Sequence, residues 1–225
     1  MAEAVNDNSD GRAPTRRERA ARTRRTILRA AYAEIADRGY HGMTMQAVAD
    51  RGGVAVQTVY LVFRTKAQLL GELLSAAIRG DLDEGSVPTR PQESEWFREA
   101  IAAGSAHEML ERFVRGAVDI WARVAVVHEA ARVAALTDPE VATVLAQTEG
   151  WRQDDYRRVV VLLDEHHGLR PGLDVDRATQ VFLTLYGPGV YLSMTQEHGW
   201  THQEYAEWVL DALSRLLLED APAEA

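Results

Sequence analysis

The chain has 225 residues, a formal net charge of −9 and no cysteine, with 46% hydrophobic and 26% charged residues. The lack of cysteine excludes disulfides and thiolate metal sites, and the composition is typical of a globular protein. No apolar run approaches the about 20 residues of a membrane span, and the polar N-terminal residues do not form a signal peptide. We therefore expect a cytoplasmic protein with no membrane partner.

The charge is distributed unevenly along the chain. Residues 1–66 carry 12 Lys+Arg against 7 Asp+Glu, whereas residues 67–225 carry 13 against 27. A basic segment before an acidic remainder is typical of a nucleic-acid-binding module joined to a body that does not touch nucleic acid. Uneven charge without any functional meaning is the alternative interpretation.

Residues 1–15 are polar and are predicted to be a disordered tail. A first helix is predicted from about Glu18 to Arg38, ending at Gly39. Its front is rich in arginine, at Arg16, Arg17, Arg19, Arg22, Arg24, Arg25 and Arg29, and an apolar stripe follows at Ile27, Leu28, Ala31, Tyr32 and Ile35. These arginines are suited to contact phosphates or a narrow minor groove, and a solvated basic face is the alternative.

Residues 44–70 predict two short helices and the start of a third. Thr44 can cap the first of these helices, and the Gly52-Gly53 pair can end it in a left-handed turn. The second helix is predicted from about Ala55 to Phe63, with Val59 and Phe63 on its buried side. Two helices across a short glycine turn form a helix-turn-helix, whose second helix enters the major groove of DNA.

The remainder of the chain predicts only helices, over residues 66–78, 96–103, 106–136, 139–167, 174–197 and 201–218. Asp138 is expected to cap a helix that has Pro139 at its first position. The segment Gly187-Pro188-Gly189 lies within the helix 174–197 and should kink it. No stretch predicts a strand, so we expect an all-α fold.

One set of residues carries a family resemblance: Gly53, Val54, Thr58, Tyr60, Phe63, Lys66, Leu69 and Leu70. In this order they resemble the signature of the TetR family of bacterial repressors. The arginine-rich first helix and Thr44 also match, and the resemblance covers about residues 15–75. The chain departs from the family at Ala55, Val62 and Arg64, where the family often has a hydroxyl, an aromatic or histidine, and a proline or lysine. Some contacts with DNA should therefore differ.

The resemblance and the side-chain chemistry together predict a set of DNA-binding residues. At the start of a helix, Thr44 and Gln46 suit a phosphate. Gln57 can bond adenine bidentately, and Leu61 can pack against a thymine methyl. Lys66, the sole lysine of the chain, offers a compact charge to a phosphate. The full set is Arg24, Arg25, Thr44, Gln46, Ala55, Gln57, Thr58, Tyr60, Leu61 and Lys66.

The resemblance also implies the domain organisation. We expect a tail at residues 1–15, a helix-turn-helix DNA-binding domain at 16–66, a linking helix at 67–80, and a helical ligand-binding and dimerisation domain at 81–225. The last two helices, 174–197 and 201–218, should pair with those of a second copy, so that the homodimer reads two half-sites of double-stranded DNA. Burial of their apolar stripes within one subunit is the alternative.

A small-molecule effector site is expected among the middle helices. Large or polar-tipped residues on otherwise apolar faces are the candidates for its lining. They are Trp121, His128, Trp151, Tyr156, Phe182, Tyr186 and Met194. Ordinary core packing is the alternative for each of them.

The sequence has no His-Glu-x-x-His spacing, no glycine-rich phosphate loop and no nucleophile elbow. We therefore expect no catalytic residues, no metal and no cofactor. The function predicted is a dimeric, ligand-responsive repressor of a (pseudo)palindromic operator, released by a small apolar or amphipathic effector. Two alternatives stay open: a DNA-binding regulator without a small-molecule ligand, and a helical small-molecule-binding protein with a vestigial DNA motif.

Overall fold

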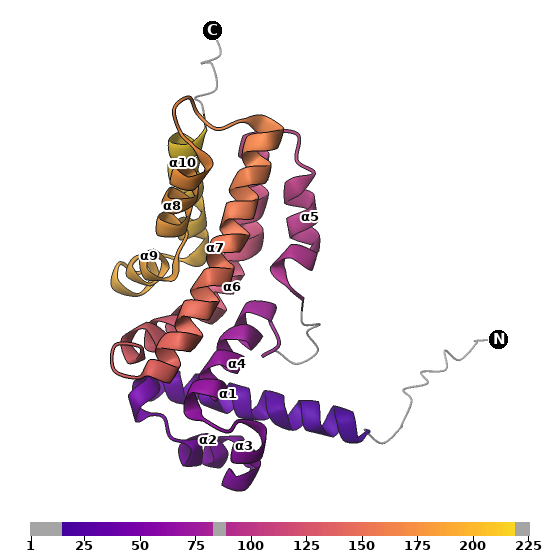
Figure 1. Cartoon of the computed structure of the whole chain (residues 1–225), viewed down its shortest axis with the longest axis vertical. Helices are drawn as coiled ribbons and strands as arrows, with labels where there is room; N and C mark the ends of the chain where they lie inside the picture. The colour runs from indigo at the N-terminus through magenta and orange to yellow at the C-terminus, as the bar shows by residue number, and fades with distance from the viewer. Residues whose placement is uncertain (1–14, 83–88, 219–225) are drawn as a thin grey trace, which may run out of the picture.

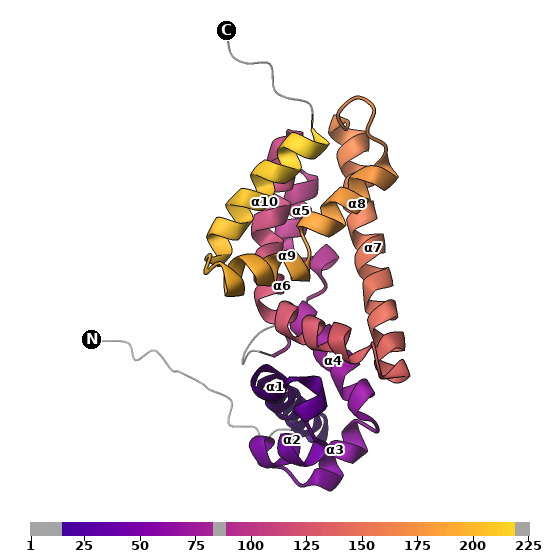
Figure 2. The same ribbon diagram turned by 90° about the vertical axis from the view of Figure 1, so that its left-hand side faces the viewer.

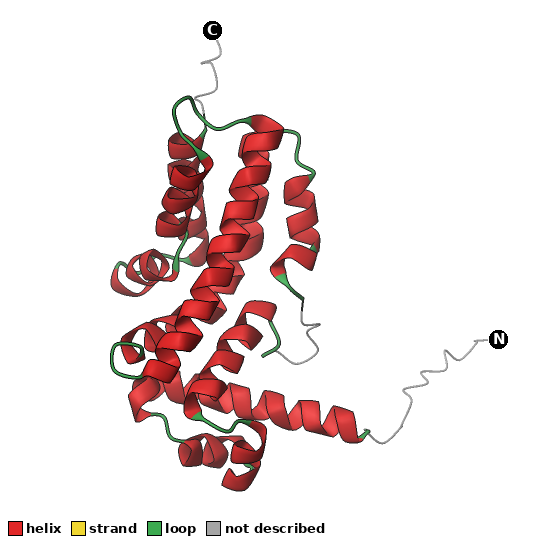
Figure 3. Cartoon of the chain, viewed as in Figure 1, coloured by secondary structure: helices red, strands yellow, loops and turns green. Residues whose placement is uncertain are grey.

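The computed structural model describes residues 15–82 and 89–218, and all regular elements in these ranges are helical (Figures 1 and 3). In chain order they are α1 (Arg16–Gly42), α2 (Met45–Gly52), α3 (Val56–Val62), α4 (Lys66–Arg79), a 3-10 turn (Pro91–Glu93), α5 (Glu95–Ile101), α6 (Ala106–Ala134), α7 (Pro139–His167), α8 (Val175–Leu185), α9 (Pro188–Leu192), a π-helical turn (Ser193–Glu197) and α10 (His202–Leu217). The all-α prediction is confirmed. The predicted tail, apart from Thr15, lies outside the described residues.

The helices form two parts, which we call the head (α1–α3) and the body (α5–α10), joined by α4. The head occupies one end of the elongated molecule, and α6 and α7 run along the length of the body (Figures 1 and 2). Within the body, α5 packs on α6, while α10 packs on α6 and α8. The first turns of α1 extend beyond the other helices of the head (Figure 1).

Local sequence signals set the helix boundaries in the head. The Thr44 hydroxyl accepts a hydrogen bond from the Ala47 N–H at the start of α2, and Gly53 ends that helix with φ of 62°. Gly39, with φ of 65° and ψ of 175°, interrupts α1, but one further helical turn follows to Gly42. The continuous first helix therefore stops at Gly39, as predicted, and the turn Tyr40–Gly42 follows as a separate helical turn, because glycine can redirect the chain without a steric penalty.

The head has a small apolar core under the helix-turn-helix. Val59 and Phe63 are wholly buried, as predicted, together with Ile27 and Val48 from the two preceding helices. Arg51 of α2 donates to the buried Glu34 of α1 at 2.7 Å, which compensates the burial of that carboxylate. This core holds α3 in a fixed position on α1 and α2.

In the body, caps and close packing define the long helices. Asp138 caps α7, with Pro139 at the first helical position, and Gly168 ends it, as the sequence predicted. Gly116 of α6 lies directly under the ring of Trp96, because a Cβ added at Gly116 would lie 2.5 Å from that ring. The α5 helix can approach α6 this closely only where a side chain is missing.

The expectation of a single kinked helix over residues 174–197 is wrong, because the structure breaks it into separate elements. Tyr186 leaves the helical conformation at ψ of 61°, and Gly187 is fully extended. A Cβ at Gly187 would lie 2.8 Å from the Leu183 carbonyl oxygen, so the sharp turn requires glycine. Pro188, which lacks an N–H, then opens α9. The chain ends this segment in the π-helical turn.

The described ranges contain no helix that combines the length and the apolar character needed to cross a bilayer.

Candidate nucleic-acid interface and ligand site

The outer face of α3 presents both apolar and polar side chains to solvent. Leu61 is 84% exposed and Tyr60 is 53% exposed, whereas the neighbouring Val59 faces the core and is wholly buried. Gln57 is exposed one turn before Leu61, so their side chains lie on the same side of the helix. Thr58 is half-buried at the edge of this face. Ala55 is exposed and provides no side-chain cap to α3.

The predicted phosphate-binding residues of α2 are exposed but have partners within the head. The Thr44 oxygen accepts from the Ala47 N–H at 3.0 Å, which leaves its own O–H free to donate. Gln46 donates through Nε2 to Asp50 at 2.7 Å. Both side chains are at the helix start that the sequence predicted, and a phosphate would compete with these internal contacts.

Arg24 and Arg25 stabilise the protein rather than pointing freely to solvent. Arg24 forms an ion pair with Glu72 of α4, and its guanidinium lies 5.1 Å from the centre of the Phe63 ring. Arg25 donates to the Asp81 carboxylate at 3.0 Å. Both residues therefore tie α1 to the segment that leads into the body.

The fully exposed arginines are earlier in α1. Arg16, Arg17 and Arg22 are exposed on the turns that extend beyond the rest of the head (Figure 1). Their exposure agrees with the phosphate contacts that the sequence suggested for this arginine-rich front, so they join the candidate interface. The sequence contained the signal for this, because the apolar stripe of α1 begins only at Ile27, so arginines well before it have no apolar face to cover.

Lys66 lies at the junction of head and body. Its ammonium nitrogen is 4.3 Å from the centre of the Tyr40 ring and donates to the His41 carbonyl at 3.4 Å. Burial lowers the pKa of Lys66, and the Asp138 carboxylate opposes that change. These residues line an open cleft of about 590 Å³, formed by Tyr40, His41, Lys66, Ala67, Asp138, Pro139 and Glu140. The predicted phosphate contact of Lys66 stays a prediction.

In the body, the predicted ligand residues divide into three groups. Tyr156, Phe182 and Tyr186 form a buried aromatic cluster, in which the Tyr156 and Phe182 rings are 4.9 Å apart. Trp121 meets Tyr186 edge-on at 6.1 Å. Phe113, which was not among the residues predicted from the sequence for this site, packs in the middle of the cluster.

The phenols of this cluster are fully hydrogen-bonded. The Tyr156 hydroxyl donates to the Tyr186 carbonyl at 3.0 Å, and the Tyr186 hydroxyl donates to the Val114 carbonyl at 2.8 Å. Burial raises the pKa of both tyrosines, so they remain neutral donors. The Tyr156 bond joins α7 to Tyr186, the residue at which α8 ends.

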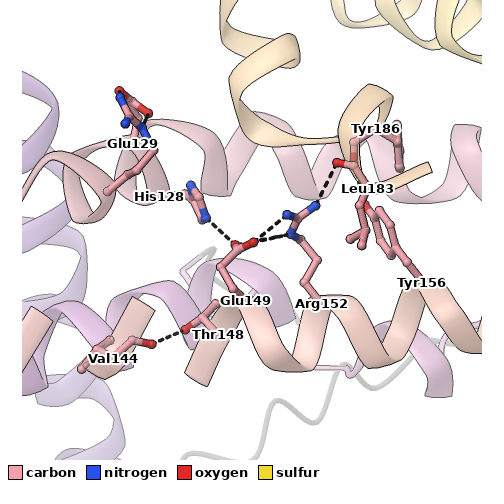
Figure 4. A network of polar contacts seen from close by, with 10 residues as sticks. His128, Glu129, Val144, Thr148, Glu149, Arg152, Tyr156, Leu183 and Tyr186 are labelled. Atoms are coloured by element: carbon pink, nitrogen blue, oxygen red, sulfur yellow. Dashed lines mark hydrogen bonds and ion pairs between the residues drawn. The ribbon is translucent and has the colours of Figure 1, made fainter. Parts of the chain in front are cut away.

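His128 belongs to a separate polar network that joins α6, α7 and the end of α8 (Figure 4). His128 Nε2 lies 2.6 Å from Glu149, whose other oxygen accepts from Arg152 at 2.6 Å; Arg152 also donates to the Leu183 carbonyl at 3.2 Å. Burial opposes the ionisation of Glu149, but His128 and Arg152 outweigh it and hold the pKa of that carboxyl at about 2.

The network leaves one atom of His128 without a partner. A carboxylate only accepts, so the hydrogen of this contact is carried by Nε2 of His128. Nδ1 is buried, and no group in the described parts of the chain hydrogen-bonds to it. Glu149 and Arg152 were missed in the sequence because their i,i+3 spacing on a long helix is also that of an ordinary surface ion pair.

The remaining two candidates lie elsewhere. Trp151 is 53% exposed on α7 and is a surface residue, so it does not line this interior. Met194 is half-buried in the π-helical turn, packed against the edge of the core. The structure therefore brings Trp121, Tyr156, Phe182 and Tyr186 together, with His128 in the adjacent network.

The helix-turn-helix region of this chain matches a known protein family. Residues 27–73, which contain the helix-turn-helix and most of α4, match the family model described as bacterial regulatory proteins, tetR family. The similarity to the TetR family in sequence therefore covers the head and the start of α4. No curated protein sequence matches the chain.

Solved structures of TetR-like regulators share the fold over most of their length. A TetR-family regulator from Syntrophomonas wolfei has a TM-score of 0.69 at 16% identity, covering 90% of this chain and 98% of that one. A regulator from Saccharomonospora viridis in complex with choline scores 0.65 at 19% identity, covering 88% and 99%. The regulator FadR from Bacillus subtilis in complex with stearoyl-CoA scores 0.60 at 20% identity, covering 84% and 96%. The TM-scores show that these proteins share the fold of this chain, and at identities of 16–20% the likeness shows the fold alone.

Proposed function

We propose that this chain is a dimeric repressor of the TetR family, which reads a (pseudo)palindromic operator through α3 and leaves it when a small apolar or amphipathic effector binds the body. The observation that carries the proposal is the outer face of α3. Leu61, which is 84% exposed, lies beside the Gln57 amide and the Tyr60 phenol. On the opposite side of the helix, Val59 is wholly buried. This arrangement fixes the backbone of α3 and leaves its outer side chains free for the major groove.

Each exposed side chain of α3 has a role that follows from its chemistry. Gln57 can bond adenine through its amide, and Leu61, on the same side, can contact a thymine methyl. Thr58 and Tyr60 can bond phosphates through their hydroxyls. The exposed arginines at the front of α1 would add charge-dependent contacts with the backbone, which carry no sequence information.

Dimerisation is proposed through α8 and α10. On α10, Tyr205, Val209 and Leu213 are buried inside the subunit. A second stripe, at Trp208, Ala212 and Leu216, is spaced four residues apart and stays half-buried or exposed. A two-fold pairing would cover this stripe and place two copies of α3 about 34–36 Å apart, or a multiple of that distance.

The effector site is proposed in the body, where the aromatic cluster adjoins the His128–Glu149–Arg152 network. The rings offer apolar surface, and Nδ1 of His128, which has no hydrogen-bond partner among the described residues, offers a contact to a polar group. The structures with choline and stearoyl-CoA support the proposal, because they are chains of this fold that hold a small molecule. Effector binding would favour a head arrangement that no longer matches the operator.

The experiment that tests the DNA function is selection of a binding sequence from random duplexes, followed by gel shifts. We expect Gln57→Ala and Leu61→Ala each to weaken specific binding by about tenfold, because one base contact contributes roughly 1–3 kcal/mol. Leu136→Ala is the matched control, since Leu136 is 77% exposed but lies outside the head. If the wild type enriches no sequence, the DNA function is wrong.

The ligand response is tested separately on the selected operator. Alkyl amines, alkanols and fatty acids of matched chain length would be screened by thermal shift and then added to the DNA complex. A compound that both stabilises the protein and releases the DNA supports the repressor. Stabilisation without release would instead favour a DNA-binding regulator whose ligand does not control it.

A further inference from the structure

We propose that Tyr40 and Asp138, with Lys66 packed on the Tyr40 ring, form a latch that fixes the orientation of the head on the body and so restricts the half-site spacing that the dimer accepts. The proposal rests on the proposed DNA-binding function. It assigns a positioning role to three residues that themselves need not touch a base.

The Tyr40 side of the latch belongs to the head. Gly39 turns the chain immediately before Tyr40, and Met43 and α2 follow it. The Tyr40 side chain is only 5% exposed, and its hydroxyl donates to Asp138 Oδ2 at 3.1 Å. This hydrogen bond joins residues 98 positions apart in the chain and crosses from the head to the first residue before α7.

The Asp138 side of the latch cannot rotate freely. Its other carboxylate oxygen, Oδ1, accepts from the backbone N–H groups of Glu140 and Val141, at 3.0 and 3.3 Å. One oxygen therefore caps α7 while the other holds the head. Because α7 is a 29-residue helix running along the body, the direction of this single carboxylate is tied to the axis of the body.

Lys66 completes the contact from a third direction. It is the first residue of α4, the helix that links the two parts, and its ammonium lies 4.3 Å from the centre of the Tyr40 ring. A cation over a ring face attracts it without fixing a direction, whereas the hydroxyl–carboxylate bond is directional. Burial and the nearby Asp138 raise the pKa of Tyr40, so its hydroxyl remains a donor at any physiological pH.

The linking helix also receives a hydrogen bond from the body, from Arg123 of α6 to the Ala77 carbonyl at 3.1 Å, and it packs on the body through apolar groups, as where Gly71 of α4 meets Val144 of α7. Apolar surfaces tolerate small sliding and rotation, because their attraction is non-directional. A directional bond at the rim of the cleft adds the restraint that such packing lacks. In a dimer, small rotations of each head change the separation of the two copies of α3, so this restraint acts on spacing.

Two variants isolate the bond. Tyr40→Phe removes only the hydroxyl and keeps the ring under Lys66. Asp138→Asn keeps an oxygen for the helix cap, since asparagine caps as well as aspartate, but replaces the oxygen that accepts from Tyr40. Tyr191→Phe is the matched control, because the buried Tyr191 hydroxyl hydrogen-bonds to His202 entirely within the body.

The first readout needs no DNA. The chain has no cysteine, so Ala36→Cys in the head and Gln153→Cys in the body give two unique sites for spin labels. Double electron–electron resonance, on labelled chains diluted with unlabelled protein, measures the distance distribution between head and body. We expect a broader distribution for Tyr40→Phe and Asp138→Asn, and an unchanged one for Tyr191→Phe.

The second readout uses the selected operator and versions with one base pair inserted or removed between half-sites. The wild type should lose affinity steeply on the altered spacings. In both latch variants this penalty should shrink about threefold, which corresponds to about 0.65 kcal/mol and to the scale of one net hydrogen bond. Tyr191→Phe should keep the wild-type penalty.

Unchanged distance distributions in both latch variants overturn the latch, as does an unchanged spacing penalty. If the wild type selects no DNA, the proposed function fails on its own account, and the label distances alone decide whether Tyr40 and Asp138 hold the head.

Discussion

The head and the body use polar groups in opposite ways. In the head, the interior is apolar apart from the paired Glu34, and the groups suited to recognition are outside, on α3 and at the front of α1. In the body, phenols, an imidazole and an ion pair are inside, between α6, α7 and α8. A surface built on a rigid core is ready to bind at once, whereas an interior site must open first. The proposed DNA-binding surface would therefore be preorganised, whereas the proposed effector site in the body would have to adjust on binding.

The largest expected effect tests the rigidity of the head. Phe63→Ala should lower the free energy of unfolding by about 3–5 kcal/mol, because it removes a wholly buried ring. Leu61→Ala, two residues away, should change it by no more than about 0.5 kcal/mol. Urea denaturation followed by circular dichroism measures both. Equal effects of the two substitutions would contradict the division of the helix-turn-helix into a core side and a recognition side.

The next effect concerns charge at the surface of the head. In the double variant Arg16→Gln/Arg17→Gln, the slope of log affinity for DNA against log salt should fall by up to about two units, one for each phosphate that an arginine no longer neutralises. Arg98→Gln/Arg158→Gln, which changes two exposed arginines of the body, should leave the slope unchanged. Fluorescence anisotropy across a salt series gives the slopes. A loss of sequence preference at unchanged slope would show instead that these arginines read bases.

A smaller effect tests the packing of the body. Gly116→Ala should cost about 1–3 kcal/mol of stability, since its new Cβ would overlap the Trp96 ring. Gly150→Ala is the control, because a Cβ at Gly150 meets no atom within 4 Å and alanine is favoured in a helix, which should stabilise by up to about 1 kcal/mol. Thermal denaturation of the two variants should therefore shift in opposite directions.

The smallest effect tests the buried network by pH. The pKa of Glu149 lies at about 2, below its ordinary value, so its ionised form stabilises the fold above about pH 4.5 and this stabilisation is lost as the pH falls toward 2. The carboxyl is partly exposed, so we expect about 1–2 kcal/mol after solvent screening. The stability difference between wild type and Glu149→Gln should shrink over this window in urea titrations. A difference independent of pH would mean that Glu149 acts through shape alone.

Short-range features of the fold were predictable from the sequence. The caps at Thr44 and Asp138 and the stop at Gly53 depend on residues within one helical turn, so local chemistry determines them. The buried positions Val59 and Phe63 followed from helical spacing. The head as a whole was predictable because its elements are short and its contacts are close in the chain.

Contacts between distant residues were not predictable in the same way. Nothing in the spacing pairs Arg25 with Asp81, and the pairing decides that this arginine is not free. The interruption at Pro188 was visible, but the carbonyl groups freed where the helix breaks accept from two distant phenols, Leu185 from Tyr205 and Tyr186 from Tyr156, which the spacing does not predict. The sequence alone could not decide whether His128 is a ligand contact or a satisfied core residue, and among the described residues only its Nε2 finds a partner.

Lys66 makes selective chemical labelling of the protein possible. Because it is the sole lysine among 225 residues, an amine-reactive reagent has one side-chain target, with the α-amino group as the other primary amine. Burial lowers the pKa of Lys66, which increases the unprotonated, nucleophilic fraction near neutral pH. A dye attached there would report from the cleft between head and body. Protection of this amine by bound DNA, or its exposure by a compound, would give a direct assay of the junction in the unmodified sequence.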